Sequence, residues 1–177
     1  MKNNLLTLFI AFVVLYSCDV VDDLTKFDLD YQTNYSIPAT TLIDSPFSLN
    51  TPDVTTESDS SFESNNTHKD LIESIKLKSL KLTIDSPESG NFNFLKEVHI
   101  YIDAEDLEEL EIANIFNLEN TDDNTISLDV LGQELKSYIK KDSFNLRVKT
   151  ITDETISQTH DITIDTKFRV DAEILGV

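Results

Sequence analysis

The segment Ile75–Ile84, with the sequence IKLKSLKLTI, indicates the fold more clearly than any other part of the chain. Apolar and polar residues alternate along it, which is the pattern of a β-strand with one buried face. The apolar residues occupy odd positions as far as Leu77 and even positions from Leu80 onward. This switch predicts a β-bulge around Lys78–Ser79, because one inserted residue redirects the side chains that follow it.

The same alternation recurs on both sides of this segment. In the segment that begins at Lys26, for example, the apolar residues stand at odd-numbered positions and the charged residues stand between them. β-Branched and aromatic residues are frequent throughout, as is typical of strands. Further strands are therefore expected at Lys26–Ile37, Phe47–Leu49, Lys96–Asp103, Leu110–Phe116, Thr125–Val130, Phe144–Ile151 and Ile156–Leu175.

Two stretches are predicted to be short helices. Thr67–Ser74 begins with the spacing of a capping box. Leu131–Asp142 has apolar residues at helical spacing, with Asp129 as a plausible N-cap. The polar segment Thr55–Asn66 predicts a loop. The last two strands are expected to pair with each other as a hairpin.

These elements predict a mostly β fold, an antiparallel immunoglobulin-like β-sandwich with two short helices. Seven to nine strands without alternating strand–helix units favour this architecture. A lipocalin-like barrel is the alternative, but three glycines give little support for repeated tight bends. A hydrophobic content of 40% is enough for a core, so a single domain is expected over residues 26–175.

The charge of the chain excludes one class of function. Its 33 acidic and 14 basic residues give a net charge of -19. Such a chain is repelled by phosphate backbones, so binding to nucleic acid is not expected. Electrostatic docking onto anionic lipid is excluded for the same reason.

The N-terminus has the pattern of a secretion signal. Lys2 supplies a positive charge, Leu5–Tyr16 is apolar, and Cys18 is the only cysteine of the chain. The apolar run is too short for a comfortable membrane span. The ending Leu15–Cys18 resembles a bacterial lipobox. The resemblance implies that residues 1–17 are removed and that a covalent lipid on Cys18 attaches the protein to a membrane.

The residues that follow the cysteine form an acidic tether, residues 18–25. Asp19, Asp22 and Asp23 resemble the surface-export signal of lipoproteins in the Bacteroidota, although an ordinary acidic tether has the same composition. The resemblance implies a lipid-anchored protein of the outer membrane that faces the cell surface, with the periplasmic face as the alternative.

Catalytic motifs are missing from the sequence. Glycine occurs only at positions 90, 132 and 176, so there is no nucleophile elbow and no phosphate-binding glycine loop. With Cys18 used for the lipid, no thiol remains for catalysis or zinc binding. We therefore expect no enzymatic activity and no cofactor. A hydrolase that uses two carboxylates is the alternative, because a sequence cannot show which acidic residues form such a pair.

Two kinds of contact site are predicted on the surface. Tyr101 has the outward parity of its strand and is a candidate for contact with a protein or glycan. Two acidic loops could supply oxygen ligands to calcium if they met at one end of the sandwich, although neither has the spacing of a calcium loop. The acidic residues concerned are Asp103, Glu105 and Asp106 in the first loop, and Asp122 and Asp123 in the second.

These features indicate where the protein is attached more clearly than which molecule it binds or converts. The first hypothesis is an accessory subunit of an outer-membrane transport, secretion or assembly complex. The second is a cell-surface module that binds glycan or protein. The hydrolase with an unrecognised carboxylate site is the third.

Overall fold

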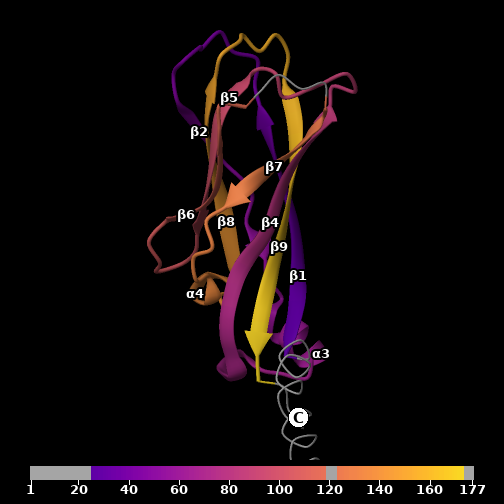
Figure 1. Ribbon diagram of the computed structural model, residues 1–177, viewed down its shortest axis with the longest axis vertical. Helices are drawn as coiled ribbons and strands as arrows, with labels where there is room; N and C mark the ends of the chain where they lie inside the picture. The colour runs from indigo at the N-terminus through magenta and orange to yellow at the C-terminus, as the bar shows by residue number, and fades with distance from the viewer. Residues whose placement is uncertain (1–24, 119–122, 174–177) are drawn as a thin grey trace, which may run out of the picture.

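Two antiparallel layers of strands make up the computed structural model, which describes residues 25–118 and 123–173 (Figure 1). The predicted mostly β, antiparallel sandwich is confirmed, whereas its immunoglobulin-like character stays a prediction. The strands are β1 (Lys26–Ile37), β2 (Phe47–Asn50), β3 (Val54–Thr55), β4 (Ile72–Ser86), β5 (Leu95–Asp103), β6 (Leu110–Phe116), β7 (Thr125–Val130), β8 (Ser143–Thr152) and β9 (His160–Ala172).

The strand order is β1-β9-β4-β7-β6-β5-β8-β2, with β3 also paired to β8. One layer contains β1, β9, β4 and β7, and the other contains β6, β5, β8 and β2. The two layers join where the end of β7 pairs with β6 through Ala113–Val130 and Asn114–Asp129. The sheet is therefore one continuous path that folds over on itself.

Strand β4 contains the bulge that its sequence predicts. Its pairing with β9 shifts register between Leu77 and Ser79, so Lys78 is the inserted residue. Leu77 and Leu80 are both buried in spite of their different parity. Two further register shifts lie near the ends of the same strand pair.

Strand β1 is as regular as β4 is irregular. All twelve of its residues pair with β9 without a register shift, from Lys26–Asp171 to Ile37–His160. At the same end, the amide of Ala172 donates to the carbonyl of Thr25 at 3.1 Å. The beginning of β1 and the end of β9 therefore lie together at one end of the molecule (Figure 1).

The core lies between the two layers and is rich in aromatic rings. Tyr31, Phe144 and Phe168 pack edge to face, with ring centroids 5.5–6.0 Å apart. Because these rings come from β1, β8 and β9, they join the two layers. Phe62, Phe92, Phe144 and Phe168 are among the largest side chains that are fully buried.

The predicted hairpin between the last two strands is wrong. β8 pairs with β5 and with β2, whereas β9 pairs with β1 and β4 in the other layer. Residues 153–159 cross between the layers. Alternation shows which side of a strand is buried but not which strand lies beside it, and β9 finds its longest partners in β1 and β4.

The helices also differ from the predictions. Ser58–Ser64 is helix α3, although its sequence predicts a loop, because Phe62 is fully buried and anchors it. Thr67–Ser74 holds only a 3₁₀ turn at Lys69–Leu71, since the Thr67 hydroxyl donates to a carbonyl of Glu173 instead of capping a helix.

The second predicted helix shortens to one turn. Helix α4 spans Lys136–Ile139, well inside the expected Leu131–Asp142. Gly132 has a φ of 73°, so the chain cannot be helical from Leu131 onward. The Glu134 carboxylate accepts hydrogen bonds from the amides of Lys136 and Ile75 and fixes this turn against β4.

Candidate functional site on the outer face of strands β6, β5 and β8

The outward side chains of β5 lie beside those of β6 and β8. His99 is paired in register with Asn114 and Lys149, and Tyr101 with Glu111 and Arg147. The pairing of β5 with β6 shifts register at Ile100–Tyr101. In consequence Ile112 and Ala113 are both buried, while Glu111 and Asn114 both lie on the outer side.

The His99 imidazole is held between acidic and amide side chains. Its Nδ1 lies 2.7 Å from Oε1 of Glu111, and its Nε2 lies 3.9 Å from a carboxylate oxygen of Glu97. The Asn114 amide also donates to Glu111, at 2.9 Å. Burial raises the pKa of Glu111, but the hydrogen bonds from Asn114 and His99 outweigh this effect and lower the pKa overall.

The Arg147 guanidinium forms the other half of the site. Its Cζ lies 4.1 Å from the centroid of the Tyr101 ring, within the range of a cation–π contact. Its Nε donates to Glu109 at 2.6 Å and a terminal nitrogen donates to the second Glu109 oxygen, while another donates to the Ser48 hydroxyl. This bidentate pair lowers the pKa of Glu109 and raises the pKa of Arg147.

Phe116 completes the surface at the end of β6. With 52% of its surface exposed, it is the most exposed large apolar residue in the part of the chain that the structure describes. Its ring lies edge-on to the His99 ring, with centroids 5.1 Å apart. The face is therefore a fixed platform of aromatic rings and hydrogen-bonded charges, and Phe116 is its exposed apolar side chain.

Tyr101, the contact residue predicted from the sequence, does lie on this face. Its ring is partly buried, because Arg147 covers it and the His99 ring stacks beside it at 6.5 Å. Phe116 and Arg147 were not predicted. The outward direction of Phe116 depends on the β6 bulge, and the apolar and polar residues of Leu110–Phe116 do not alternate regularly enough to reveal it.

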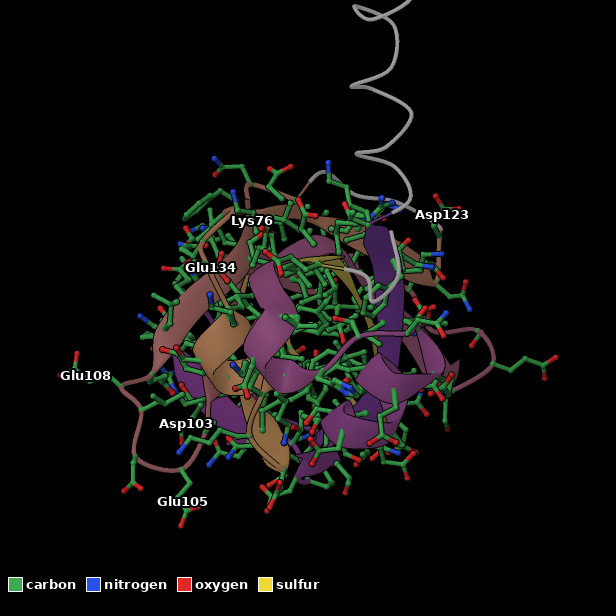
Figure 2. All side chains as sticks on the ribbon, turned by 90° about the horizontal axis from the view of Figure 1, so that it is seen from below. Lys76, Asp103, Glu105, Glu108, Asp123 and Glu134 are labelled. Carbon is green, nitrogen blue, oxygen red and sulfur yellow. The ribbon has the colours of Figure 1, made fainter. Side chains whose placement is uncertain are left out.

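The two acidic loops lie at opposite ends of β6. Asp103, Glu105 and Asp106 precede this strand and Asp123 follows it. Seven residues separate the loops by roughly 20 Å, and Figure 2 shows Asp103 and Asp123 on different sides of the molecule. The described acidic residues of the two loops therefore lie far apart, and calcium binding by these loops stays a prediction.

In the described ranges no three His, Cys, Asp or Glu side chains are grouped as metal ligands would be. Asp122 lies outside these ranges.

The predicted anchor residues also lie outside the described part of the chain. They are Cys18, Asp19, Asp22 and Asp23. Within residues 25–118 and 123–173, no helix combines the length and the apolar character needed to cross a membrane.

Comparisons with known proteins give structural likenesses only. No family model matches the chain, and no curated protein does so. A structure from Desmodium yellow mottle tymovirus is 15% identical, with 86% of this chain and 91% of that chain covered and a TM-score of 0.28. The protein FLHE is 7% identical over 82% and 98%, with a TM-score of 0.31. The BFDV capsid protein is 7% identical over 84% and 99%, with a TM-score of 0.34. At these scores the likenesses assign neither a family nor a function.

Proposed function

We propose that this chain is a non-enzymatic, lipid-anchored outer-membrane lipoprotein of the Bacteroidota type, and an accessory subunit that binds a partner protein. The observation that carries the binding role is the face formed by Phe116, His99, Tyr101 and Arg147. Aromatic residues and arginine are the side chains that contribute most to protein interfaces. The ion pairs already hold Arg147 in place, so little rotamer entropy is lost when a partner binds.

The geometry of Tyr101 favours a protein over a glycan as the partner of this face. A sugar stacks best on a free ring face, but Arg147 and His99 already cover part of the Tyr101 ring. Phe116 is the exposed ring, and it stands at the end of a strand where a pocket of a partner protein could enclose it.

The anchor follows from the lipobox-like sequence that ends in Cys18. Strand β1 begins at Lys26, so the lipid and the sandwich are separated by at most roughly 30 Å of extended chain. Two or three acyl chains bind a membrane firmly, since each buried methylene contributes about 0.8 kcal/mol. The sandwich end that carries Lys26 and Ala172 would then face the membrane.

Replacement of the anchor cysteine tests the first part of the proposal. We expect Cys18→Ala to abolish labelling by a radioactive fatty acid and to leave the signal peptide uncleaved. Cys18→Ser is a second variant with the same expected result. Membrane retention and normal processing of either variant would refute the lipid anchor.

Photocrosslinking in intact cells tests the binding face. A photoreactive amino acid at position 116 should give one dominant crosslinked protein, whereas the same amino acid at position 42 should not. Leu42 is a matched control, because it is an exposed apolar residue elsewhere on the surface. Phe116→Asp should remove the partner from material purified in mild detergent, and Leu42→Asp should retain it. A protein that always purifies alone would contradict the subunit role.

A further inference from the structure

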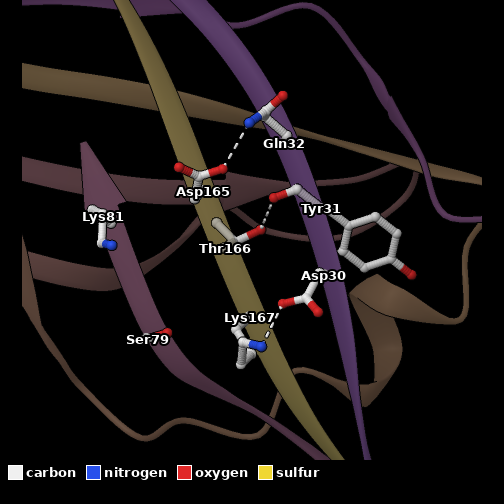
Figure 3. A pocket seen from close by; sticks show the side chains of 8 residues that line it. All are labelled: Asp30, Tyr31, Gln32, Ser79, Lys81, Asp165, Thr166 and Lys167. Carbon is white, nitrogen blue, oxygen red and sulfur yellow. Dashed lines mark hydrogen bonds and ion pairs between the residues drawn. The ribbon is translucent and has the colours of Figure 1, made fainter. Parts of the chain in front are cut away.

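The layer opposite to the proposed interface has a shallow depression of about 410 Å³ on its outer side (Figure 3). It extends across β1, β9 and the bulged part of β4. Most of its lining groups can form hydrogen bonds. The lining residues are Asp30, Tyr31, Gln32, Ser79, Lys81, Asp165, Thr166 and Lys167.

The bulge of β4 accounts for the shape of the depression. Because Lys78 is inserted, both Lys78 and the small Ser79 lie on the exposed side of the strand. The serine leaves room between two lysines. Lys78 is directed to Asp28, with its Nζ 2.7 Å from the carboxylate, which leaves Lys81 beside the depression.

Most charges around the depression are already paired. Gln32 Nε2 donates to Asp165 at 2.8 Å, and Lys167 lies 2.9 Å from Asp30. Lys81 is different. Among the described residues its ammonium group has no hydrogen bond and no ion pair, although Lys81 is paired in register with Asp165. The depression thus contains one ammonium group without a bonded partner among hydroxyl, amide and carboxylate groups.

This environment is unusual in a chain with a net charge of -19. Five of the 14 basic residues lie on β4 and β9 within this layer. They offset most of the acidic residues of the same strands and of β1, so an anionic ligand meets less repulsion here than the net charge of the whole chain implies. The five are Lys76, Lys78, Lys81, Lys167 and Arg169.

We propose that this depression binds a carboxylate-bearing saccharide, with the Lys81 ammonium paired to the sugar carboxylate. Asp30 and Asp165 have remaining lone pairs and would accept hydrogen bonds from sugar hydroxyls, while Ser79 can donate or accept. An acidic peptide fits less well, because its repeated charges would face the two aspartates without hydroxyl donors to offer them. This site is separate from the proposed protein interface and does not depend on the lipid anchor.

Titration of the purified full-length protein in detergent with trigalacturonate tests the site. Lys81→Gln should weaken binding at least about tenfold, because it removes a charge-assisted hydrogen bond. Lys76→Gln is the matched control and should change affinity less than twofold, since Lys76 is also exposed and without an ion pair on the same strand but lies outside the depression. Thermal unfolding should be the same for both variants.

Three results with the trisaccharide would overturn the proposal. They are equal weakening by Lys81→Gln and Lys76→Gln, equal binding of the fully methyl-esterified trisaccharide, and absence of binding by the unaltered protein. Binding of a hexaglutamate peptide with equal or higher affinity would also overturn it, in favour of a peptide ligand.

Discussion

The outer faces of the two layers differ in how their side chains are stabilised. On β1, β9 and β4 they form a ladder of ion pairs and hydrogen bonds, such as Asp28 with Lys78 and Arg169. On β6, β5 and β8, aromatic rings pack against the paired charges, as Tyr101 does against Arg147. Both faces rest on the same apolar core. Burial therefore constrains only every second residue of a strand, and the outward residues of each layer are free to serve a different purpose.

The largest loss of stability should come from a change in the apolar core that lies beneath both faces. Phe168→Ala deletes a fully buried ring that contacts Tyr31 and Phe144 between the layers. We expect the free energy of unfolding to fall by about 3–5 kcal/mol. Urea denaturation monitored by circular dichroism measures this loss. A loss below about 1 kcal/mol would show that the two layers do not depend on a common aromatic core.

A smaller effect should distinguish the ion-pair ladder from ordinary surface charge. Asp28→Asn breaks the pairs with Lys78 and Arg169, and only 23% of the Asp28 side chain is exposed. We expect a loss of about 1–2 kcal/mol. Asp30→Asn is the matched control, because Asp30 pairs with Lys167 but is 67% exposed, and its loss should stay below about 0.5 kcal/mol. Equal losses of unfolding free energy would mean that the pairs of Asp28 stabilise the protein no more than an exposed ion pair does.

The pH dependence of stability should show the same contribution from Asp28. Burial raises the pKa of Asp28, but Lys78 and Arg169 outweigh it and lower the pKa below the ordinary value of 3.8. A carboxylate with a lowered pKa in the folded state stabilises the protein above its unfolded pKa, and the stabilisation is lost as the pH falls through the folded pKa. Unfolding measured between pH 6 and pH 2.5 should therefore show a smaller decline below about pH 4 in Asp28→Asn than in the unaltered protein.

The smallest loss of stability should come from a change on the outer face of β6, β5 and β8. Phe116→Ala removes an exposed ring at the end of β6, so the free energy of unfolding should change by less than about 0.5 kcal/mol. The midpoint of thermal unfolding measures this change. A stability loss comparable to that of Phe168→Ala would assign Phe116 to the core and remove the basis for its proposed role as a contact residue.

Alternation alone was sufficient to predict several elements of the fold. The strand Lys26–Ile37 is predicted with its observed bounds, and the switch of phase in Ile75–Ile84 locates the bulge of β4. Both predictions depend on the burial of one strand face, which the pattern of apolar residues records directly.

Features that depend on distant partners could not be predicted in this way. The β8–β9 hairpin is wrong because pairing follows from the lengths and neighbours of strands far apart in the sequence. Helix α3 forms in a polar segment because one residue, Phe62, is buried against the rest of the protein. The outer face of β6, β5 and β8 was predicted only through Tyr101, since a bulge in an irregular strand directs Phe116 outward.

The unbroken pairing of β1 with β9 also determines how the molecule resists force. If a lipid on Cys18 holds the protein, a ligand that pulls the far end of the sandwich away loads β1 along its length. The hydrogen bonds of an antiparallel pair lie perpendicular to the strands, so such a pull shears the bonds along all twelve residue pairs together instead of opening them one at a time. Under such a load, a strand of this regularity would act as a mechanical clamp between the proposed anchor and the rest of the sandwich.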